Sequence, residues 1–156
     1  MLLGILSDTH DNLLKIRGAL AFFAEKQVGA LIHAGDFIAP FALKEILKFD
    51  GPVYAVFGNN DGEHEGLQKL LPDLGEQPLR LDLDGRIIGV AHDRKKLTKA
   101  DKTGLDVLVV GHTHRAEISA CDPLLLNPGE CGAWTTGAST VITLDTETLE
   151  AQIHEI

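Results

Sequence analysis

The chain has few cysteines, few aromatic residues and no long apolar run. Its 156 residues include only two cysteines, Cys121 and Cys131, and 5% aromatic side chains. Two cysteines are too few for a disulfide framework, and they lack the spacing of a zinc-binding knuckle. No apolar stretch approaches the roughly 18 to 20 residues that cross a bilayer, and the first strand-like run has no basic leader or cleavage site. We therefore expect a cytoplasmic protein of a reducing compartment that has no contact with a membrane.

Positive charge is also scarce. The chain carries 14 Lys and Arg residues against 23 Asp and Glu residues, which gives a formal net charge of -9. Proteins that bind long nucleic acids use many basic side chains to neutralise phosphates, so this composition makes a long nucleic acid an unlikely partner. An anionic substrate would need a local source of positive charge.

The composition is otherwise that of an ordinary folded domain. Hydrophobic residues make up 44% and charged residues 24% of the chain, which excludes disorder, collagen-like repeats and a coiled coil. The length fits one domain, residues 1–156, with no linker or repeat inside it.

Apolar periodicity predicts alternating strands and helices in the first half. Short apolar runs followed by residues at helical spacing give a βαβαβ pattern, which implies parallel strands. The predicted strands are 2–6, 30–34 and 53–57, and the predicted helices are 13–23, 40–49 and 65–71.

The second half is predicted to be mostly strands, and antiparallel. Asp84-Gly85 separates two strand-like runs and is a typical hairpin turn. The predicted strands are 79–83, 87–91, 107–110, 117–121, 124–126, 140–144 and 149–153. We expect an α/β fold, a four-layer α/β/β/α sandwich of two mixed β-sheets flanked by helices.

Polar residues follow the predicted strands at their carboxyl ends. Asp8, Asp36, Asn59, His92 and His112 each lie within a few residues of such an end. Ligands of open α/β sheets bind at that edge, so these side chains can converge. Oxygen and nitrogen donors without thiolates suit Mn, Fe, Ni, Co or Zn, and the sequence does not choose among these metals.

Four motifs in this order resemble the calcineurin-like metallophosphoesterase superfamily. They are Asp8-Thr9-His10, Gly35-Asp36, Gly58-Asn59-Asn60-Asp61 and Gly111-His112-Thr113-His114. The length and the Asn127-Pro128-Gly129 turn are most similar to the small single-domain phosphodiesterase group, which the retromer scaffold subunit also resembles.

The resemblance implies a dinuclear metal site. Residues carried over to one metal are Asp8, His10, Asp36 and His114, and those carried over to the other are Asp36, Asn59, His92 and His112. Two divalent ions, most simply Mn²⁺, would share Asp36. A metal-bridged hydroxide would then attack a small phosphodiester in line.

The sequence departs from the family pattern at two places. Asn60 stands where many members have a histidine that is thought to protonate the leaving group, and Asp61 is at most its orienting partner. His92-Asp93-Arg94 replaces a frequent His-Gly-His. Asn59 and Arg94 are the candidate contacts to substrate.

Simpler interpretations exist for several of these residues. Asp8 and His10 could belong to a turn or helix cap, Asn59 could be a left-handed turn residue, and residues 94–96 could be a solvated basic face. The remaining residues of interest are expected to be structural or exposed (His33, His64 and His154) or packed (Cys121, Cys131 and Trp134).

Three functions remain open at this point. The leading hypothesis is a metal-dependent phosphodiesterase, and a phosphomonoesterase or nuclease would use the same site. A non-catalytic interaction scaffold of the same fold is the third, since fold alone does not establish activity. The physiological substrate and the oligomeric state, including a homo-oligomer, are left open.

Overall fold

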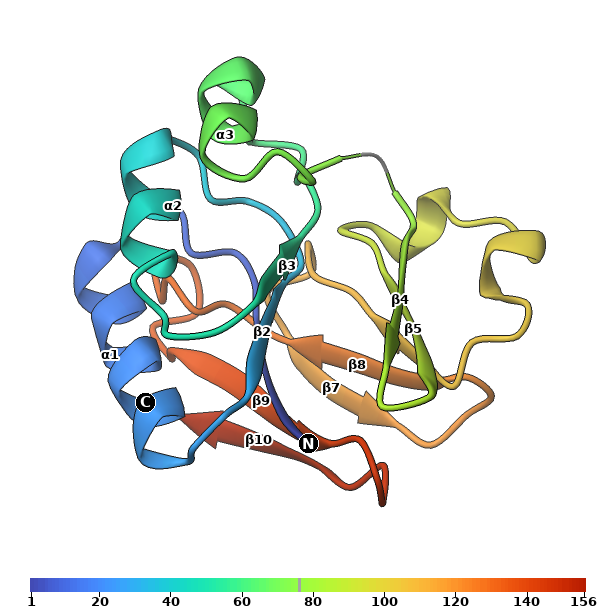
Figure 1. Cartoon of the computed structure of the whole chain (residues 1–156). Helices are drawn as coiled ribbons and strands as arrows, with labels where there is room; N and C mark the ends of the chain where they lie inside the picture. Colours follow the sequence, from blue (N-terminus) through green and yellow to red (C-terminus); the bar gives the residue numbers. More distant parts are fainter. Residues whose placement is uncertain (76) are drawn as a thin grey trace.

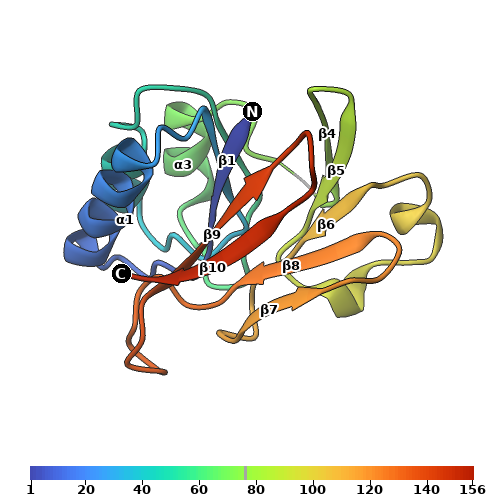
Figure 2. The same ribbon diagram turned by 90° about the horizontal axis from the view of Figure 1, so that it is seen from below.

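Two five-stranded β-sheets pack face to face in the computed structural model, which describes residues 1–75 and 77–156 (Figures 1 and 2). The first sheet has the strand order β10-β9-β1-β2-β3, and the second has the order β4-β5-β6-β8-β7. The strands are β1 (Leu2–Leu6), β2 (Ala30–His33), β3 (Val53–Ala55), β4 (Leu79–Leu83), β5 (Arg86–Val90), β6 (Val107–Val109), β7 (Ala116–Ser119), β8 (Leu124–Pro128), β9 (Thr140–Asp145) and β10 (Ala151–Glu155). The helices are α1 (Leu13–Glu25), α2 (Pro40–Ile46) and α3 (His64–Leu70), and two 3-10 turns are η1 (Arg94–Lys96) and η2 (Ala100–Lys102).

Each sheet has a parallel centre and antiparallel edges. β1, β2 and β3 run parallel, while β9 pairs antiparallel with both β1 and β10. In the second sheet β5, β6 and β8 run parallel, and β4 and β7 are antiparallel edge strands. The expectation of an antiparallel second half is therefore wrong for its centre. The segment 91–106 is long enough to carry the chain back to the starting edge of the sheet, as a parallel pair requires.

The main hydrophobic core lies between the two sheets. Alternate residues of β1 and β9, such as Leu3, Ile5 and Leu144, pack against Val90 and Val109 of the second sheet. All five are fully buried. This core fixes the two sheets relative to each other and so aligns the edges where their parallel strands end.

The α-helices cover the outer face of the first sheet (Figure 1). Helix α1 begins after Asn12, whose side chain accepts a hydrogen bond from the Lys15 amide, and it buries Ile16, Ala19 and Phe23. Helix α2 begins with Pro40 in the position that tolerates a missing amide hydrogen. It ends at Ile46 rather than at residue 49.

The outer face of the second sheet is covered differently. There Leu97, beside η1, packs with Leu105 and Leu108 in a small separate cluster. The two-sheet α/β sandwich expected from the sequence is confirmed, with 3-10 turns rather than α-helices in this outermost layer. In the described ranges, no helix has both the length and the apolar character of a membrane span.

Candidate metal centre

The carboxyl ends of the central parallel strands of both sheets meet at one edge. Asp8 follows β1, Asp36 follows β2 and Asn59 follows β3, while His92 follows β5 and His112 follows β6. Hydrogen bonds and ion pairs link all five residues, through side chains or backbone, into one cluster. The convergence expected from the sequence is therefore present, and it is produced by the packing of the two sheets.

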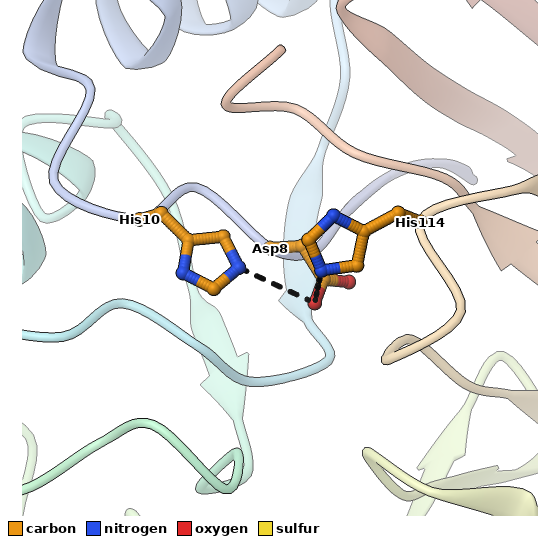
Figure 3. A group of neighbouring side chains, drawn as sticks. All are labelled: Asp8, His10 and His114. Carbon is orange, nitrogen blue, oxygen red and sulfur yellow. Dashed lines mark ion pairs between the residues drawn. The ribbon is translucent and has the colours of Figure 1, made fainter. Parts of the chain in front are cut away.

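A first group of side chains surrounds Asp8 (Figure 3). Asp8 Oδ1 lies 3.4 Å from His114 Nε2 and 3.8 Å from His10 Nε2, and His10 Nε2 is also 3.6 Å from Asp36 Oδ2. The other oxygen, Asp8 Oδ2, accepts hydrogen bonds from Ser7 Oγ at 2.6 Å and from the His112 amide at 3.1 Å. One oxygen of Asp8 is thus held by the protein, and the other faces the two imidazoles.

A second group surrounds Asn59. The amide oxygen Oδ1 of Asn59 is 3.0 Å from His92 Nε2 and 2.8 Å from His112 Nδ1, and His92 Nε2 is 3.4 Å from Asp36 Oδ2. His92 is 2% exposed, and its Nδ1 lies 2.7 Å from the carbonyl oxygen of Ala34. This second contact fixes the ring so that Nε2 faces the cluster.

Asp36 belongs to both groups. Its Oδ2 contacts His10 from one side and His92 from the other, and the carboxylate is 1% exposed. Burial favours the neutral acid, but hydrogen bonds from His92 and Asn60 outweigh it and hold the pKa of Asp36 well below its usual range. Asp36 is therefore a buried anion between two sets of imidazoles.

The backbone of the cluster is strained in a repeated way. Asp8, Asp36 and His112, at the ends of three different strands, have φ values of 54°, 63° and 69°, and His10 and His114 have φ values of 41° and 59°. Left-handed backbone costs a non-glycine residue roughly 1 to 3 kcal/mol and tends to persist at functional sites. Asn59 is not among the described residues with positive φ, so its simpler interpretation as a left-handed turn residue is wrong.

Two glycines allow the strand-end loops to approach one another. A Cβ on Gly58 would lie 2.0 Å from Asp36 Oδ1, and a Cβ on Gly111 would lie 2.1 Å from Ser7 Oγ. Both distances are far below van der Waals contact. Glycine at these positions is therefore required for Asp36 and Asp8 to keep their places.

Asn60 and Asp61 are positioned close to Asp36 but in different ways. The Asn60 side chain donates to Asp36 Oδ2 at 2.7 Å, and its backbone amide donates to Asp36 Oδ1 at 2.9 Å. The Asp61 carboxylate is 4% exposed and accepts hydrogen bonds from the amides of Asp36, Ile38 and Gly58. These contacts make Asp61 a brace between the loops after β2 and β3, and they do not orient Asn60.

Glu130 is a residue of the cluster that the sequence analysis missed. It follows β8, is fully buried, and places Oε1 3.2 Å from His114 Nδ1. Burial opposes ionisation, but hydrogen bonds from Thr136 and Thr135 prevail and lower the pKa of Glu130 to about 2. The apolar run 124–126 predicts a strand, but no local signal shows that this strand ends at the same edge as the other parallel strands.

Arg94 is not drawn into the cluster. Its guanidinium lies 3.3 Å from Glu117 Oε2, and its side chain is 45% exposed. The contacts of the described residues therefore give no support to Arg94 as a substrate contact, and its 3-10 turn fits the simpler view of a solvated basic segment.

The other residues singled out from the sequence have mixed outcomes. His33 is fully buried and structural, His64 is exposed, and Cys131 packs in the core as expected. Trp134 is 68% exposed, and Cys121 is also exposed, so the expectation that both pack inside is wrong. Trp134 instead donates its indole N–H to the carbonyl oxygen of His10 at 3.0 Å.

The chemistry of the cluster fits divalent cations. Within residues 1–75 and 77–156, three buried polar atoms lack a hydrogen-bond partner, namely Asp8 Oδ1, His10 Nε2 and His114 Nδ1. Uncompensated buried polar atoms are costly, and two of these face each other across the first group. A cation ligated by Asp8 and His10 would compensate both atoms.

A fold of two packed sheets with carboxylates, imidazoles and an amide at the strand ends defines a metallophosphoesterase. The model of the calcineurin-like phosphoesterase superfamily domain matches residues 1–149, and the chain belongs to this family. A Methanocaldococcus jannaschii protein named phosphodiesterase MJ0936 is 39% identical over 159 residues, which cover 96% of each chain. The chain is thus an enzyme of the phosphodiesterase and metallophosphoesterase type.

Solved structures agree with this assignment. A structure described as a novel archaeal phosphodiesterase has a TM-score of 0.89 and 37% identity, with all of both chains covered. Vps29 of Chaetomium thermophilum has a TM-score of 0.73 at 16% identity and covers 100% of this chain and 97% of its own. The Vps29 similarity is one of fold.

Proposed function

We propose that this protein is a divalent-metal-dependent phosphodiesterase with a dinuclear site and a small diester as substrate. The observation that carries the proposal is the position of Asp36, whose Oδ2 faces His10 in one group and His92 in the other. A carboxylate in that position can hold two cations at the separation that two-metal hydrolases use. The name of the relative MJ0936 supports a diester substrate.

The proposed ligands follow the two groups. Asp8, His10, Asp36 and His114 would hold one cation, and Asp36, Asn59, His92 and His112 would hold the other. Nitrogen and oxygen donors without thiolate fit Mn²⁺, with Fe²⁺, Co²⁺, Ni²⁺ and Zn²⁺ as alternatives. Glu130 would orient His114 through its Nδ1, as carboxylates commonly do for ligating histidines.

The protein's residues divide the work of the reaction. Bound divalent ions supply the Lewis acidity that activates water for in-line attack and neutralises phosphoryl charge. Asp36 stays ionised at neutral pH because His92 and Asn60 hydrogen-bond its carboxylate. Asn60 donates hydrogen bonds but cannot release a proton, so the leaving group must depart without help from this position.

The proposed cations also explain how an acidic chain can bind an anionic substrate. The formal charge of the protein is -9, whereas two divalent ions add a concentrated positive charge at one edge of the sheets. A small diester needs only that local field. A long nucleic acid would also meet the net negative charge of the whole chain.

The decisive experiment is a metal titration with an activity readout. Metal-stripped protein is titrated with Mn²⁺, and hydrolysis of an aryl phosphodiester is compared with hydrolysis of the matching aryl monoester. We expect diester turnover to appear with metal and to exceed monoester turnover. The Asp36→Ala variant should lose nearly all activity and bind neither ion, because it removes the shared ligand.

The control is Asp106→Asn. Asp106 is a partly exposed carboxylate that precedes β6, at the opposite end of this strand from His112, and it contacts the Ile87 amide and Arg86. The variant should retain metal content and turnover. Wild-type metal content in Asp36→Ala would overturn the shared-ligand assignment. No turnover with any divalent ion in folded wild-type protein would favour the non-catalytic scaffold, and faster monoester turnover would favour a phosphomonoesterase.

A further inference from the structure

A cavity of about 490 Å³ lies close to the strand ends that carry Asn59 and His92, and none of its lining residues is a proposed metal ligand. Its lining comes from the loop after β3, from α3 and from the segment around η1, and includes Phe57, His64, Gln77 and Lys96. Ligand-binding cavities for small molecules typically have about 300 to 1,000 Å³. The volume is thus large enough for an organic group of nucleoside size.

The cavity wall is joined directly to the residues of the metal centre. Phe57 precedes the Gly58-Asn59 pair, so the ring that lines the cavity and the amide that faces His92 are two residues apart. Gln77 connects both strand ends, because its Oε1 accepts a hydrogen bond from the His92 amide at 2.6 Å and its Nε2 donates to the Phe57 carbonyl oxygen. A diester whose phosphorus lies at the metal centre could therefore extend one of its organic groups into this cavity.

The lining favours a planar ring. Phe57 and His64 are stacked, with ring centroids 4.0 Å apart and an interplanar angle of 16°. His64 is exposed, so the pair offers an aromatic face on which another ring can stack. Stacking of a nucleobase on an aromatic side chain is a common and sequence-tolerant way to bind it.

The lining also favours a ring that carries both hydrogen-bond donors and acceptors. The Lys96 ammonium can only donate, and the Asp101 carboxylate can only accept. Hydrogen bonds from the Thr98 side chain and amide lower the pKa of Asp101, which keeps it ionised. One positive and one negative side chain in the lining suit a neutral polar heterocycle better than a second phosphate or an alkyl chain.

We propose that this cavity binds the nucleoside part of a small phosphodiester, with the base stacked on the Phe57–His64 pair. The inference rests on the proposed diesterase function and names its substrate class. The base is recognised by stacking and by the Lys96 and Asp101 side chains, while the phosphate is handled at the neighbouring metal centre. The substrate is then a nucleotide ester rather than a dialkyl phosphate.

Two diesters with the same leaving group test the proposal. They are the nitrophenyl ester of thymidine monophosphate and methyl nitrophenyl phosphate, both hydrolysed by Mn²⁺-loaded protein. We expect wild-type kcat/KM to be at least about tenfold higher for the nucleoside ester. The ratio of the two kcat/KM values should fall by about tenfold in His64→Ala and by several-fold in Lys96→Ala.

Lys95→Ala is the matched control, since it removes a neighbouring lysine whose side chain is not part of the cavity lining. Its ratio should equal that of the wild type. A wild-type ratio near one, or ratios that are the same in all variants, would overturn the subsite.

Failure of the diesterase function itself can be recognised separately. If the wild type hydrolyses neither ester, binding of thymidine monophosphate is measured by calorimetry on the same protein. Binding that weakens in His64→Ala but not in Lys95→Ala would support the nucleoside site without the reaction. Absence of binding would refute the site as well.

Discussion

In the proposed reaction, Asn60 would limit which leaving groups this site can handle. Its side chain is held against Asp36 Oδ2 at 2.7 Å, next to both groups of the metal centre. An amide in that position can stabilise charge by hydrogen bonding but has no proton to transfer near neutral pH. Esters with acidic leaving alcohols should therefore react faster than esters with alkoxide leaving groups.

Replacing Asn60 by histidine should restore a general acid. We expect Asn60→His to raise kcat/KM for an alkyl-leaving diester or a monoester by about tenfold or more, within the range usual for general acid catalysis. The gain should be much smaller for a nitrophenyl leaving group, which needs no proton. Equal gains for both leaving groups would show that the new side chain acts in another way.

The buried His33 ring connects the loops after β1 and β2, and it must remain neutral to make these contacts. Its Nδ1 accepts a hydrogen bond from the Gly35 amide at 3.1 Å, and its Nε2 lies 3.1 Å from Thr9 Oγ1. Its ring stacks on Phe37 with centroids 3.9 Å apart. Complete burial lowers the pKa of His33 to about 3, so the folded protein excludes the proton that the unfolded chain accepts.

This difference predicts a pH-dependent stability. Below the unfolded pKa of about 6.5 the unfolded state binds a proton that the folded state does not, so stability is present above that pH and is lost as pH falls toward 3. The slope from this residue is at most about 1.4 kcal/mol per pH unit. Urea unfolding of metal-free wild type and His33→Gln at several pH values should show the variant less stable at pH 7.5 and the gap narrowing below about pH 6.5. A constant gap would contradict the neutral, buried histidine.

A site residue was predictable from the sequence where it follows a strand that the sequence itself predicts. Asp8, Asp36, Asn59 and His112 satisfy this condition, because each comes directly after an apolar run. Glu130 does not stand out, since the sequence does not reveal that β8 is parallel to β6 and ends at the same edge. The contacts of Asp61 were not predictable, because two of its three amide donors come from the loop after β2, which only the fold brings close.

At the level of elements, the strand-end loops touch where a side chain would not fit. Gly111 follows β6 and lies over the loop after β1, so that a Cβ there would meet Ser7 Oγ at 2.1 Å and Asp8 Oδ2 at 3.0 Å. The close approach of the two sheets at this edge therefore requires that residue 111 have no Cβ atom. Elsewhere in the chain the same substitution has room, as at Gly18 in α1, where a Cβ would have no heavy atom within 4 Å.

The two glycines give a matched pair of variants. Gly111→Ala should lower the free energy of unfolding by about 1 to 3 kcal/mol and reduce metal content, because the loops after β1 and β6 must separate. Gly18→Ala should raise the free energy of unfolding by about 0.5 to 1 kcal/mol, since alanine is the better helix former at an exposed position. Denaturant titrations and metal analysis of both proteins check the pair. Normal metal content in Gly111→Ala would mean that the loops after β1 and β6 can separate without displacing the metal ligands.

Element types were largely predictable, and sheet order was not. The first three strands, the three α-helices and the Asp84-Gly85 hairpin lie within a few residues of their predicted bounds. Their local signals are period, capping residues and turn residues. The parallel centre of the second sheet depends on the paths of segments 91–106 and 110–123, which bring β6 beside β5 and β8 beside β6. These paths have no local signal in the sequence, and the prediction of antiparallel pairing is wrong there.

At the scale of the whole molecule, one core serves both sheets. The residues between the sheets come from β1, β2 and β9 on one side and from β4, β5, β6 and β8 on the other, so neither sheet buries its inner face without the other. We infer that residues 1–156 unfold as one unit. Urea transitions followed by circular dichroism and by tryptophan emission should then coincide, and two separate transitions would contradict a single domain.

Metal binding should stabilise the whole fold. Ions that bind only the folded state add RT ln(1 + [L]/Kd), about 2.7 kcal/mol per site at a hundredfold excess over Kd. For a chain of this size, that corresponds to a rise in Tm of roughly 5 °C or more. Thermal unfolding with and without Mn²⁺ should show the rise in wild type and not in Asp36→Ala. An equal rise in both proteins would place the ions elsewhere.

The position of Trp134 gives the protein a built-in optical reporter. It is the single tryptophan of the chain, it is 68% exposed, and its indole N–H is bonded to the carbonyl oxygen of His10. Its backbone amide is tied to Glu130, which also contacts His114. Indole emission is sensitive to small changes in local polarity, so binding of the proposed ions at the strand ends should change the fluorescence of this one side chain, in unlabelled protein and in real time.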